Sequence, residues 1–184
     1  ESDKLSPGSA QALTDNGSMV REVMQSIRTI SHLLHPPLLD EAGLPSALQW
    51  YVDEFSKRSG IRVHLDCEDS LERLPSELET AIFRIVQECL GNVHRHSESQ
   101  TASIRLEING DRAYVEVRDQ GKGIPSDLQG ELKTKGHLGV GLRGIRERIV
   151  QFGGELQIDS SSEGTVVRAM IPCTPIAPAT DEVA

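Results

Sequence analysis

Residues 76–97 read SELETAIFRIVQECLGNVHRHS, and this stretch predicts a helix with one apolar face and one polar face. Its apolar residues recur at spacings of three and four, which is the period of a helix packed against a core. They are Leu78, Ile82, Ile85, Cys89 and Val93. Pro75 and Ser76 are typical of a helix start. We therefore expect a half-buried helix from about Ser76, with its second face available for chemistry.

The polar face of this predicted helix carries Arg84, Glu88, Asn92, Arg95 and His96. A carboxylate can take up a proton, an amide oxygen suits a magnesium shell, and a guanidinium can neutralise phosphate. A solvated polar face would explain the same pattern, so this helix alone does not identify a site.

A glycine turn, DQGKG at residues 119–123, follows a segment of alternating apolar and polar residues. Gly121 and Gly123 permit a tight turn and a close approach of a ligand to the backbone. The carboxylate of Asp119, held at a strand end, can accept a hydrogen bond from an exocyclic amine such as that of adenine. An ordinary strand-to-loop turn with an Asx motif is equally consistent with the pattern.

A second glycine motif, GVGLRG at residues 139–144, precedes a predicted helical run. Backbone N–H groups and the positive end of that helix can face an anion such as a polyphosphate. Helix capping by glycine is the alternative interpretation. Between the two glycine motifs, residues 124–138 contain few apolar side chains, so we expect a mobile lid there.

The rest of the chain supplies helices and hairpins around these motifs. Before the central helix we expect a helix over residues 18–34 that ends at Pro36 and Pro37, a helix over 45–57 and a strand over 61–67. After it we expect two hairpins, the first turning at residues 109–111 and the second formed by GELQIDS and GTVVRAMIP. This mixture predicts an α+β fold, a two-layer α/β sandwich with helices on one sheet face, and disfavours a doubly wound parallel sheet.

The predicted elements divide the chain into four parts. We assign residues 1–17 to a polar connector, 18–40 to a helix with its join, 41–174 to the main domain and 175–184 to a flexible tail. The helix over residues 18–34 has a narrow apolar stripe, which suits pairing in a helical bundle or docking on the main domain. The stripe consists of Val20, Val23, Ile27, Ile30 and Leu34.

Composition excludes several classes of function. The chain has 184 residues and a formal net charge of −9, so it lacks the basic excess of a nonspecific binder of nucleic acid or anionic membrane. Its three cysteines form no CxxC pair, which argues against a zinc site or a disulfide framework and fits a reducing cytoplasm. No stretch approaches the ~18 consecutive apolar residues of a membrane span. The chain starts at Glu1 rather than Met, and we expect it to be part of a longer protein.

Four motifs occur in an order that resembles the Bergerat-fold ATP-binding domain of sensor histidine kinases. Residues 88–96 resemble its N box, residues 119–123 its G1 box, and residues 139–144 its G2 box. SEGTVV, which contains Gly164 and Thr165, is similar to its last ATP-site strand. The resemblance covers about residues 33–172. LLHPPLLDEAGL resembles the join between dimerisation helix and ATPase domain in the nitrate-sensor-like subfamily.

The resemblance implies ATP and Mg²⁺ as cofactors. In that case Asp119 binds the adenine amino group, Asn92 coordinates Mg²⁺, and Glu88 acts as a base or polarises the acceptor histidine. Arg95 and His96 lie by the phosphates, and Thr165 supports Asp119. The full set of implied ATP-binding residues is Asn92, Arg95, His96, Asp119, Gly121, Gly123, Ile124, His137, Gly139, Gly141, Leu142 and Thr165.

The resemblance also implies a phosphoacceptor histidine followed directly by an acidic residue, and none of the six histidines here has such a follower. We expect the acceptor helix upstream of Glu1, a homodimer in the full-length protein and a response regulator receiver domain as partner. Any membrane attachment would come from upstream regions, and this part of the protein would not label itself. The alternatives are a non-kinase Bergerat-fold ATPase, an anti-sigma-factor-type kinase, or a degenerate nucleotide-binding dimerisation module.

Overall fold

The computed structural model describes residues 16, 19–20, 37–68, 71–125 and 140–173. The chain divides into two units, Glu1–Leu38 and Leu39–Ala184. Among residues 1–36, the described Asn16, Met19 and Val20 are helical and exposed. The rest of the helix predicted over residues 18–34 lies outside the described residues.

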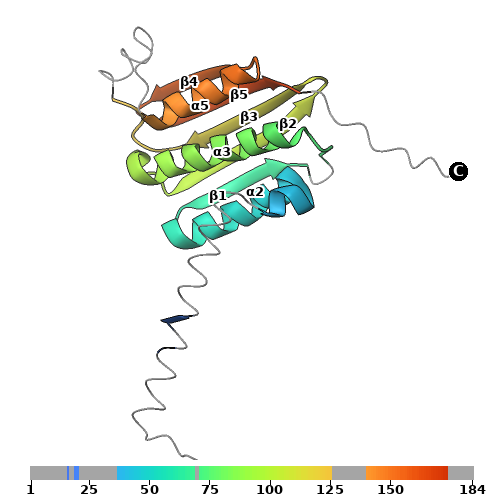
Figure 1. The fold of residues 1–184 in the computed structure, drawn as a ribbon. Coiled ribbons are helices and arrows are strands. Elements are labelled where there is room, and N and C mark those ends of the chain that lie inside the picture. Colours follow the sequence, from blue (N-terminus) through green and yellow to red (C-terminus); the bar gives the residue numbers. More distant parts are fainter. Residues whose placement is uncertain (1–15, 17–18, 21–36, 69–70, 126–139, 174–184) are drawn as a thin grey trace, which may run out of the picture. The chain divides into compact units, whose positions relative to one another are not determined.

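The second unit is built on a five-stranded sheet with the order β1-β2-β3-β5-β4 (Figure 1). Its strands are β1 (Arg62–Cys67), β2 (Thr101–Asn109), β3 (Arg112–Asp119), β4 (Glu155–Ser161) and β5 (Gly164–Pro172). Strands β2 and β3 form one predicted hairpin and β4 and β5 the other, and both are antiparallel. β1 pairs with β2 in parallel, because a helix crosses over between them. The sheet is therefore mixed, with one parallel pair.

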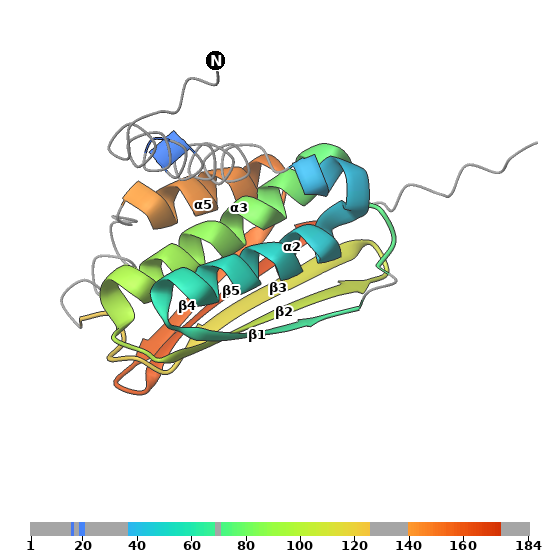
Figure 2. The ribbon, with the colours of Figure 1, turned by 90° about the horizontal axis from the view of Figure 1, so that it is seen from below.

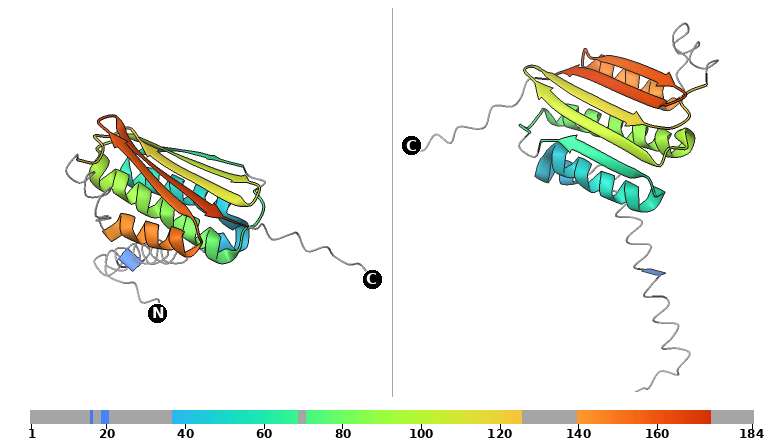
Figure 3. Two further views of the ribbon diagram at one scale, coloured as in Figure 1. Left: turned by 90° about the horizontal axis from the view of Figure 1, so that it is seen from above. Right: turned by 180° about the vertical axis from the view of Figure 1, so that it is seen from behind.

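Three helices cover one face of this sheet: α2 (Pro37–Ser59), α3 (Ser76–Asn92) and α5 (Val140–Gln151). Figure 2 shows the helices as one layer and the strands as the other, and Figure 3 shows from behind that none of the described helices lies on the opposite sheet face. A π-helical turn, η1 (Val93–Ser97), continues α3. The predicted two-layer α+β sandwich is confirmed.

The core lies between the helices and the sheet. All five residues of the apolar stripe predicted on α3 are buried. On the sheet, β3 and β5 alternate between buried and more exposed side chains, as expected for strands with one covered face. Ile104 of β2 and Ile171 of β5 are fully buried against the helix layer.

Helix α2 begins earlier than the sequence predicts. It consists of two helical pieces joined at Gly43, whose φ of 80° lies in the left-handed region that glycine tolerates. The second piece contains Pro45, the predicted start, and ends at Ser59 before Gly60. Pro37, one of the two prolines expected to end the preceding helix, is the first residue of α2. The second compact unit begins at Leu39, within the first piece of α2.

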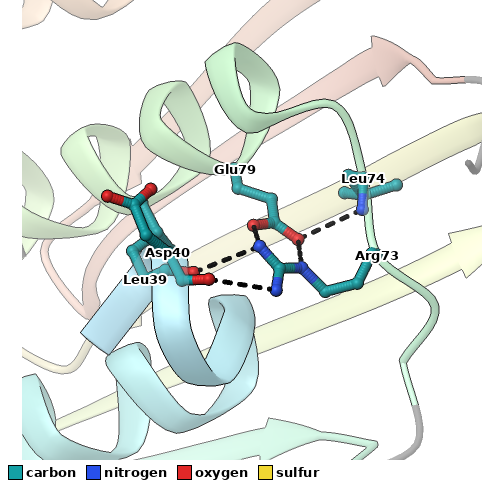
Figure 4. A network of polar contacts seen from close by, with 5 residues as sticks. All are labelled: Leu39, Asp40, Arg73, Leu74 and Glu79. Carbon is teal, nitrogen blue, oxygen red and sulfur yellow. Dashed lines mark hydrogen bonds and ion pairs between the residues drawn. The ribbon is translucent and has the colours of Figure 1, made fainter. Parts of the chain in front are cut away.

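A network around Arg73 fastens the first piece of α2 to the start of α3 (Figure 4). The Arg73 guanidinium donates two hydrogen bonds of 3.0 Å to Glu79, a carboxylate with only 2% of its side chain exposed. It also donates to the backbone carbonyls of Leu39 and Asp40 at 3.3 and 3.4 Å, while the Leu74 N–H donates to Glu79. The buried Glu79 carboxylate is thereby fully engaged, which is the usual requirement for burying a charge.

Candidate functional site

Three predicted site residues meet on α3 and η1. The Nη2 atom of Arg95 donates to Glu88 Oε1 at 3.1 Å and to Asn92 Oδ1 at 3.0 Å. Residues 88, 92 and 95 are separated by four and three positions, so they share one helix face. The Arg95 and Glu88 side chains are 53% and 33% exposed, so this group lies at the surface and can reach a ligand.

The second glycine motif approaches the same carboxylate. A Cβ atom built on Gly141 would lie 1.9 Å from Glu88 Oε1 and 2.7 Å from its Cδ. Only glycine can therefore occupy this position with Glu88 where it is. The sequence predicted that Gly141 precedes the helix, but it lies inside α5, which begins at Val140. Leu142 follows it in α5 and is partly exposed.

Two predicted site residues of this region, His137 and Gly139, lie outside the described residues, as do residues 126–138 of the predicted lid. Ile124, at the start of the lid, is described. Its N–H donates to Ser160 Oγ at 2.7 Å, which holds Ile124 against β4.

Asp119 ends β3 as a buried carboxylate with 6% of the residue exposed. Its Oδ1 atom accepts a hydrogen bond of 2.8 Å from the Gly121 N–H, which forms the predicted Asx turn. Within the described ranges, no hydrogen bond reaches the other carboxylate oxygen, Oδ2. A buried carboxylate oxygen without a donor is costly, so this atom is suited to accept a hydrogen bond from a ligand.

The turn over residues 119–124, here called the Asp119 turn, is packed against the backbone of other elements. The Ser97 carbonyl accepts a hydrogen bond from the Lys122 N–H at 2.9 Å, and a Cβ on Gly121 would lie 2.1 Å from that carbonyl oxygen. A Cβ on Gly123, whose φ is 72°, would lie 1.9 Å from the Ser161 carbonyl oxygen. Both glycines are required because neighbouring backbone leaves no room for a side chain.

Strand β5 contacts the Asp119 turn as well. Gly164 lies so close that a Cβ would be 2.1 Å from the Asp119 carbonyl oxygen. Thr165, expected to support Asp119, places its Oγ1 3.0 Å from Ser160 Oγ. Ser160 in turn accepts the Ile124 N–H. Thr165 therefore reaches the turn through Ser160, at the turn's far end.

Sequence reasoning missed Ser97, Ser99 and Ser160. Ser97 Oγ donates to the Val93 carbonyl within η1 and accepts the Ser99 N–H, while Ser99 Oγ accepts the Gln120 N–H. These serines join the end of η1 to the Asp119 turn. Ser97 and Ser99 have no signal in the sequence beyond a short polar run after the predicted helix, and Ser160 is one of three consecutive serines, so none of them stands out from an ordinary turn.

The π-helical turn sets the direction of the residues after Asn92. Such turns occur mainly as short insertions, often at functional sites. Here η1 leaves His96 exposed and places the His94 ring 6.3 Å from the Phe55 ring of α2. His94 thus faces a neighbouring helix, while Arg95 reaches back to Glu88. No described side chain contacts His96 closely enough to assign it a role.

Burial controls the ionisation of two groups beside this face. Desolvation raises the pKa of Tyr51, on α2, to about 12; the charge of Arg58 acts against this shift and that of Glu88 adds to it. Burial, with a smaller contribution from Glu88, also raises the pKa of Cys89 to about 12. Cys89 therefore remains a thiol at neutral pH, which excludes it as a nucleophile because the thiolate is the reactive form.

The donor atoms of this face fit one kind of metal ion. Among the described residues, no group of three His, Cys, Asp or Glu side chains could hold a metal. Asn92 Oδ1 is a hard oxygen on an accessible face, and Mg²⁺ commonly takes one or two protein oxygens together with phosphates and water. The residues therefore fit Mg²⁺ that arrives with a phosphate ligand, and they do not fit a metal caged by the protein alone.

A protein-family model described as "Histidine kinase-, DNA gyrase B-, and HSP90-like ATPase" matches residues 77–175, which contain the polar face of α3, the Asp119 turn and β5. The chain belongs to this ATPase family. Its match begins at the second residue of α3 and covers more than half of the chain. The predicted assignment to a histidine kinase-type ATPase domain is confirmed.

Curated relatives narrow the assignment within the family. The chain is 36% identical over 149 residues to "Sensor histidine kinase MctS" of Rhizobium johnstonii, and 33% identical over 169 residues to "Oxygen sensor histidine kinase NreB" of Staphylococcus carnosus. These matches cover 81% and 88% of this chain but 32% and 47% of the relatives, so the chain spans a third to a half of their length. It is the ATP-binding catalytic domain of a sensor histidine kinase.

Solved structures agree with this family assignment. The histidine kinase domain of the blue-light activated kinase EL346 from Erythrobacter litoralis superimposes with a TM-score of 0.62 and 25% identity, covering 73% of this chain and 67% of that domain. The predicted Bergerat fold is thereby confirmed. A search of the described helices for one long and apolar enough to cross a bilayer finds none.

Proposed function

We propose that this domain binds MgATP between α3, the Asp119 turn and α5, and transfers the γ-phosphoryl group to a histidine of a dimerisation helix. The observation that supports this best is Asp119, a buried carboxylate at a strand end with one oxygen engaged by the turn and the other without a donor among the described residues. An exocyclic amine supplies the missing donor, and adenine carries one.

The remaining residues have roles that follow from their chemistry and placement. Asn92 Oδ1 offers a ligand to Mg²⁺, and the bound ion would neutralise charge on the phosphates. Glu88 is placed to accept or polarise the proton of the attacking imidazole. Gly141 brings α5 against the same face, where its backbone can face phosphate oxygens. In phosphoryl transfer, positioning and charge neutralisation supply most of the rate enhancement, so few side chains are needed.

The proposal extends to the partners of the whole protein. After transfer to histidine, the phosphoryl group passes to a response regulator receiver domain, and a homodimer brings the acceptor helix to the catalytic domain. Because ATP and receiver domains are cytoplasmic, we place this domain in the cytoplasm, with any membrane attachment in other parts of the protein.

The test is nucleotide binding by calorimetry with an Asp119→Ala variant. We expect wild-type protein to bind ATP in the presence of Mg²⁺ more tightly than GTP, because guanine presents a carbonyl where adenine presents an amine. Loss of a buried, charge-assisted hydrogen bond costs about 1–3 kcal/mol, so Asp119→Ala should weaken ATP binding roughly tenfold or more.

The matched control for this test is Asp66→Ala, which removes an exposed carboxylate of β1. It should leave ATP affinity unchanged, and circular dichroism should show that both variants are folded. Equal affinity of the wild type for ATP and GTP, or normal ATP binding by Asp119→Ala, would contradict the proposal.

A further inference from the structure

The guanidinium of Arg95 lies against the helix surface at Gly91, where no side chain is in its way. A Cβ atom on Gly91 would lie 3.2 Å from Arg95 Nη1 and 3.4 Å from Nη2, closer than most side-chain contacts allow. Gly91 therefore leaves room for the guanidinium to lie against the helix between Glu88 and Asn92. The φ angle of Gly91 is not in the left-handed region, so backbone geometry does not explain why a glycine stands at this position.

From this place Arg95 engages the same two oxygens that the proposed function uses. A single nitrogen, Nη2, donates to Glu88 Oε1 and to Asn92 Oδ1. Asn92 Oδ1 is the proposed magnesium ligand, and the Glu88 carboxylate is the proposed proton acceptor. A guanidinium and a divalent cation repel each other, so both cannot lie beside Asn92 Oδ1 without a large electrostatic cost.

We propose that Arg95 acts as an internal cation that competes with Mg²⁺ for Asn92 and Glu88, so that the metal binds well only together with ATP. This inference rests on the proposed function. A metal ion alone offers Arg95 no alternative partner, so Arg95 keeps its hydrogen bonds to Glu88 Oε1 and Asn92 Oδ1. A triphosphate offers several anionic oxygens to which a guanidinium binds strongly, so Arg95 moves to the phosphates and releases Asn92 to the metal. Arg95 is thus a positioning residue that couples metal binding to nucleotide binding.

The proposed coupling between metal binding and ATP binding can be measured as a ratio of binding constants. If ATP relieves the competition, ATP raises the affinity for the metal, and the metal raises the affinity for ATP by the same factor. Removing the Arg95 charge should raise metal affinity in the absence of nucleotide and reduce this factor. A purely structural role for Arg95 would lower stability and leave metal affinity without nucleotide unchanged.

The experiment uses Mn²⁺ as a probe, because the free ion has an electron paramagnetic resonance signal that is lost on binding. Mn²⁺ is titrated with wild-type chain and with Arg95→Met, which keeps the aliphatic stem and removes the charge. Without nucleotide, we expect Arg95→Met to bind Mn²⁺ more tightly by a factor on the order of ten, as removal of one nearby positive charge implies. With ATP present, the gain in Mn²⁺ affinity should be smaller for the variant than for the wild type.

Two further variants test whether the change in Mn²⁺ affinity arises at Asn92. Arg105→Met removes an arginine of the same exposure, 54%, from an ion pair on the open sheet face, and it should bind Mn²⁺ like the wild type. Adding Asn92→Ala to Arg95→Met should abolish the gain. Thermal unfolding followed by circular dichroism establishes that every variant is folded.

The outcomes separate this inference from the proposed function. If the wild type binds ATP but Arg95→Met binds Mn²⁺ no tighter than the wild type, the competition does not exist. If the gain persists in the double variant, or appears equally in Arg105→Met, it does not arise at Asn92, and the inference is wrong. If the wild type binds no ATP by calorimetry, the proposed function itself fails, whatever the Mn²⁺ titration gives.

Discussion

At the scale of single residues, the burial of Tyr51 indicates how far the polar face of α3 is shielded from solvent on one side. The residue is 5% exposed, its ring packs edge-on against Phe83 at 5.5 Å, and its hydroxyl ionises only at a pKa of about 12. The charges of Glu88 and Arg95 make smaller, opposite contributions to this pKa: Glu88 raises it and Arg95 lowers it. The site is therefore open to ligands on one side and bounded by apolar packing on the other.

The raised pKa of Tyr51 predicts a loss of stability at high pH. In the unfolded chain the phenol ionises near pH 10, whereas in the folded chain it stays neutral until about pH 12. The folded state then holds more protons than the unfolded state, so the free energy of unfolding falls as pH rises from 10 to 12. A shift of two units corresponds to about 3 kcal/mol at most.

Urea denaturation at pH values from 8 to 11.5, followed by circular dichroism, measures this loss. Tyr51→Phe should show a shallower decline than the wild type. Cys89 also ionises late in the folded state, from an ordinary 9.0 to about 12, but it is present in both proteins and cancels in the comparison. Parallel stability curves for the two proteins would show that Tyr51 ionises normally.

Among single residues, chemistry that depends on local spacing was predictable and chemistry that depends on distant neighbours was not. Glu88, Asn92 and Arg95 share a helix face through their spacing alone, and the structure brings them together. Ser160 lies 36 residues from Ile124 in the chain, and its hydrogen bond to the Ile124 N–H exists only because β4 ends beside the Asp119 turn. No local pattern distinguishes this serine from its neighbours Ser161 and Ser162.

At the scale of elements, the Asp119 turn depends on contacts between backbone atoms of different elements. Gly121 lies against the end of η1, Gly123 against the end of β4, and Gly164 of β5 against Asp119 itself. Backbone atoms cannot move aside as a flexible side chain can, so these contacts fix the position of the Asp119 carboxylate. The hydrogen bond from the Lys122 N–H to Ser97 adds to the same junction.

Gly121→Ala tests this junction. The added methyl group would lie 2.1 Å from the Ser97 carbonyl oxygen, so the turn or η1 must shift. We expect the free energy of unfolding, measured by urea denaturation, to fall by about 1–3 kcal/mol, as for other overpacked positions. ATP affinity should fall as well, since Asp119 moves with the turn.

The matched control is Gly144→Ala in α5, where a Cβ meets nothing within 4 Å. Alanine favours a helix interior over glycine by up to about 1 kcal/mol, so this variant should be as stable as the wild type or more so. Unchanged stability in Gly121→Ala, with Gly144→Ala behaving as expected, would show that the junction is loose.

Element types were largely predictable, whereas the ends of helices were not. Hydrophobic periods of two and of three to four residues identified the β2–β3 and β4–β5 hairpins and α3. The early start of α2 at Pro37 depends on Arg73, whose guanidinium binds the carbonyls before the Gly43 kink from 33 residues away. The local sequence, Pro36 and Pro37 followed by Gly43, does not indicate that this helix start binds Arg73. The parallel pairing of β1 with β2 likewise follows from the packing of α3 across the sheet.

At the scale of the whole domain, the two faces of the sheet differ in chemistry. The helix-covered face is apolar, while the open face carries charged side chains in contact with one another. Arg168 binds Glu116 at 2.7 Å and also pairs with Asp159, and Tyr114 donates to Glu116. Burial alone would raise the pKa of Glu116, but hydrogen bonds from Arg168 and Tyr114 lower it overall. This face is suited to water rather than to a second apolar layer.

Phosphohistidine formation tests the prediction about the acceptor. None of the six histidines is followed by an acidic residue, so the 184-residue chain should bind ATP without labelling itself. Incubation with γ-labelled ATP and Mg²⁺ should give no acid-labile, base-stable label, while calorimetry on the same preparation shows ATP binding. Labelling of His32 or His35, located by mass spectrometry, would show that the acceptor lies within this chain.

The crowded glycines of the Asp119 turn have a consequence for inhibition. A compound that binds against this turn contacts residues that cannot gain even one methyl group without disturbing η1, β4 or β5. Resistance to a drug usually arises by substitutions that enlarge a side chain at the binding surface and leave the enzyme working. Here Gly121, Gly123 and Gly164 offer no such route, so escape mutations would have to arise at other positions of the site.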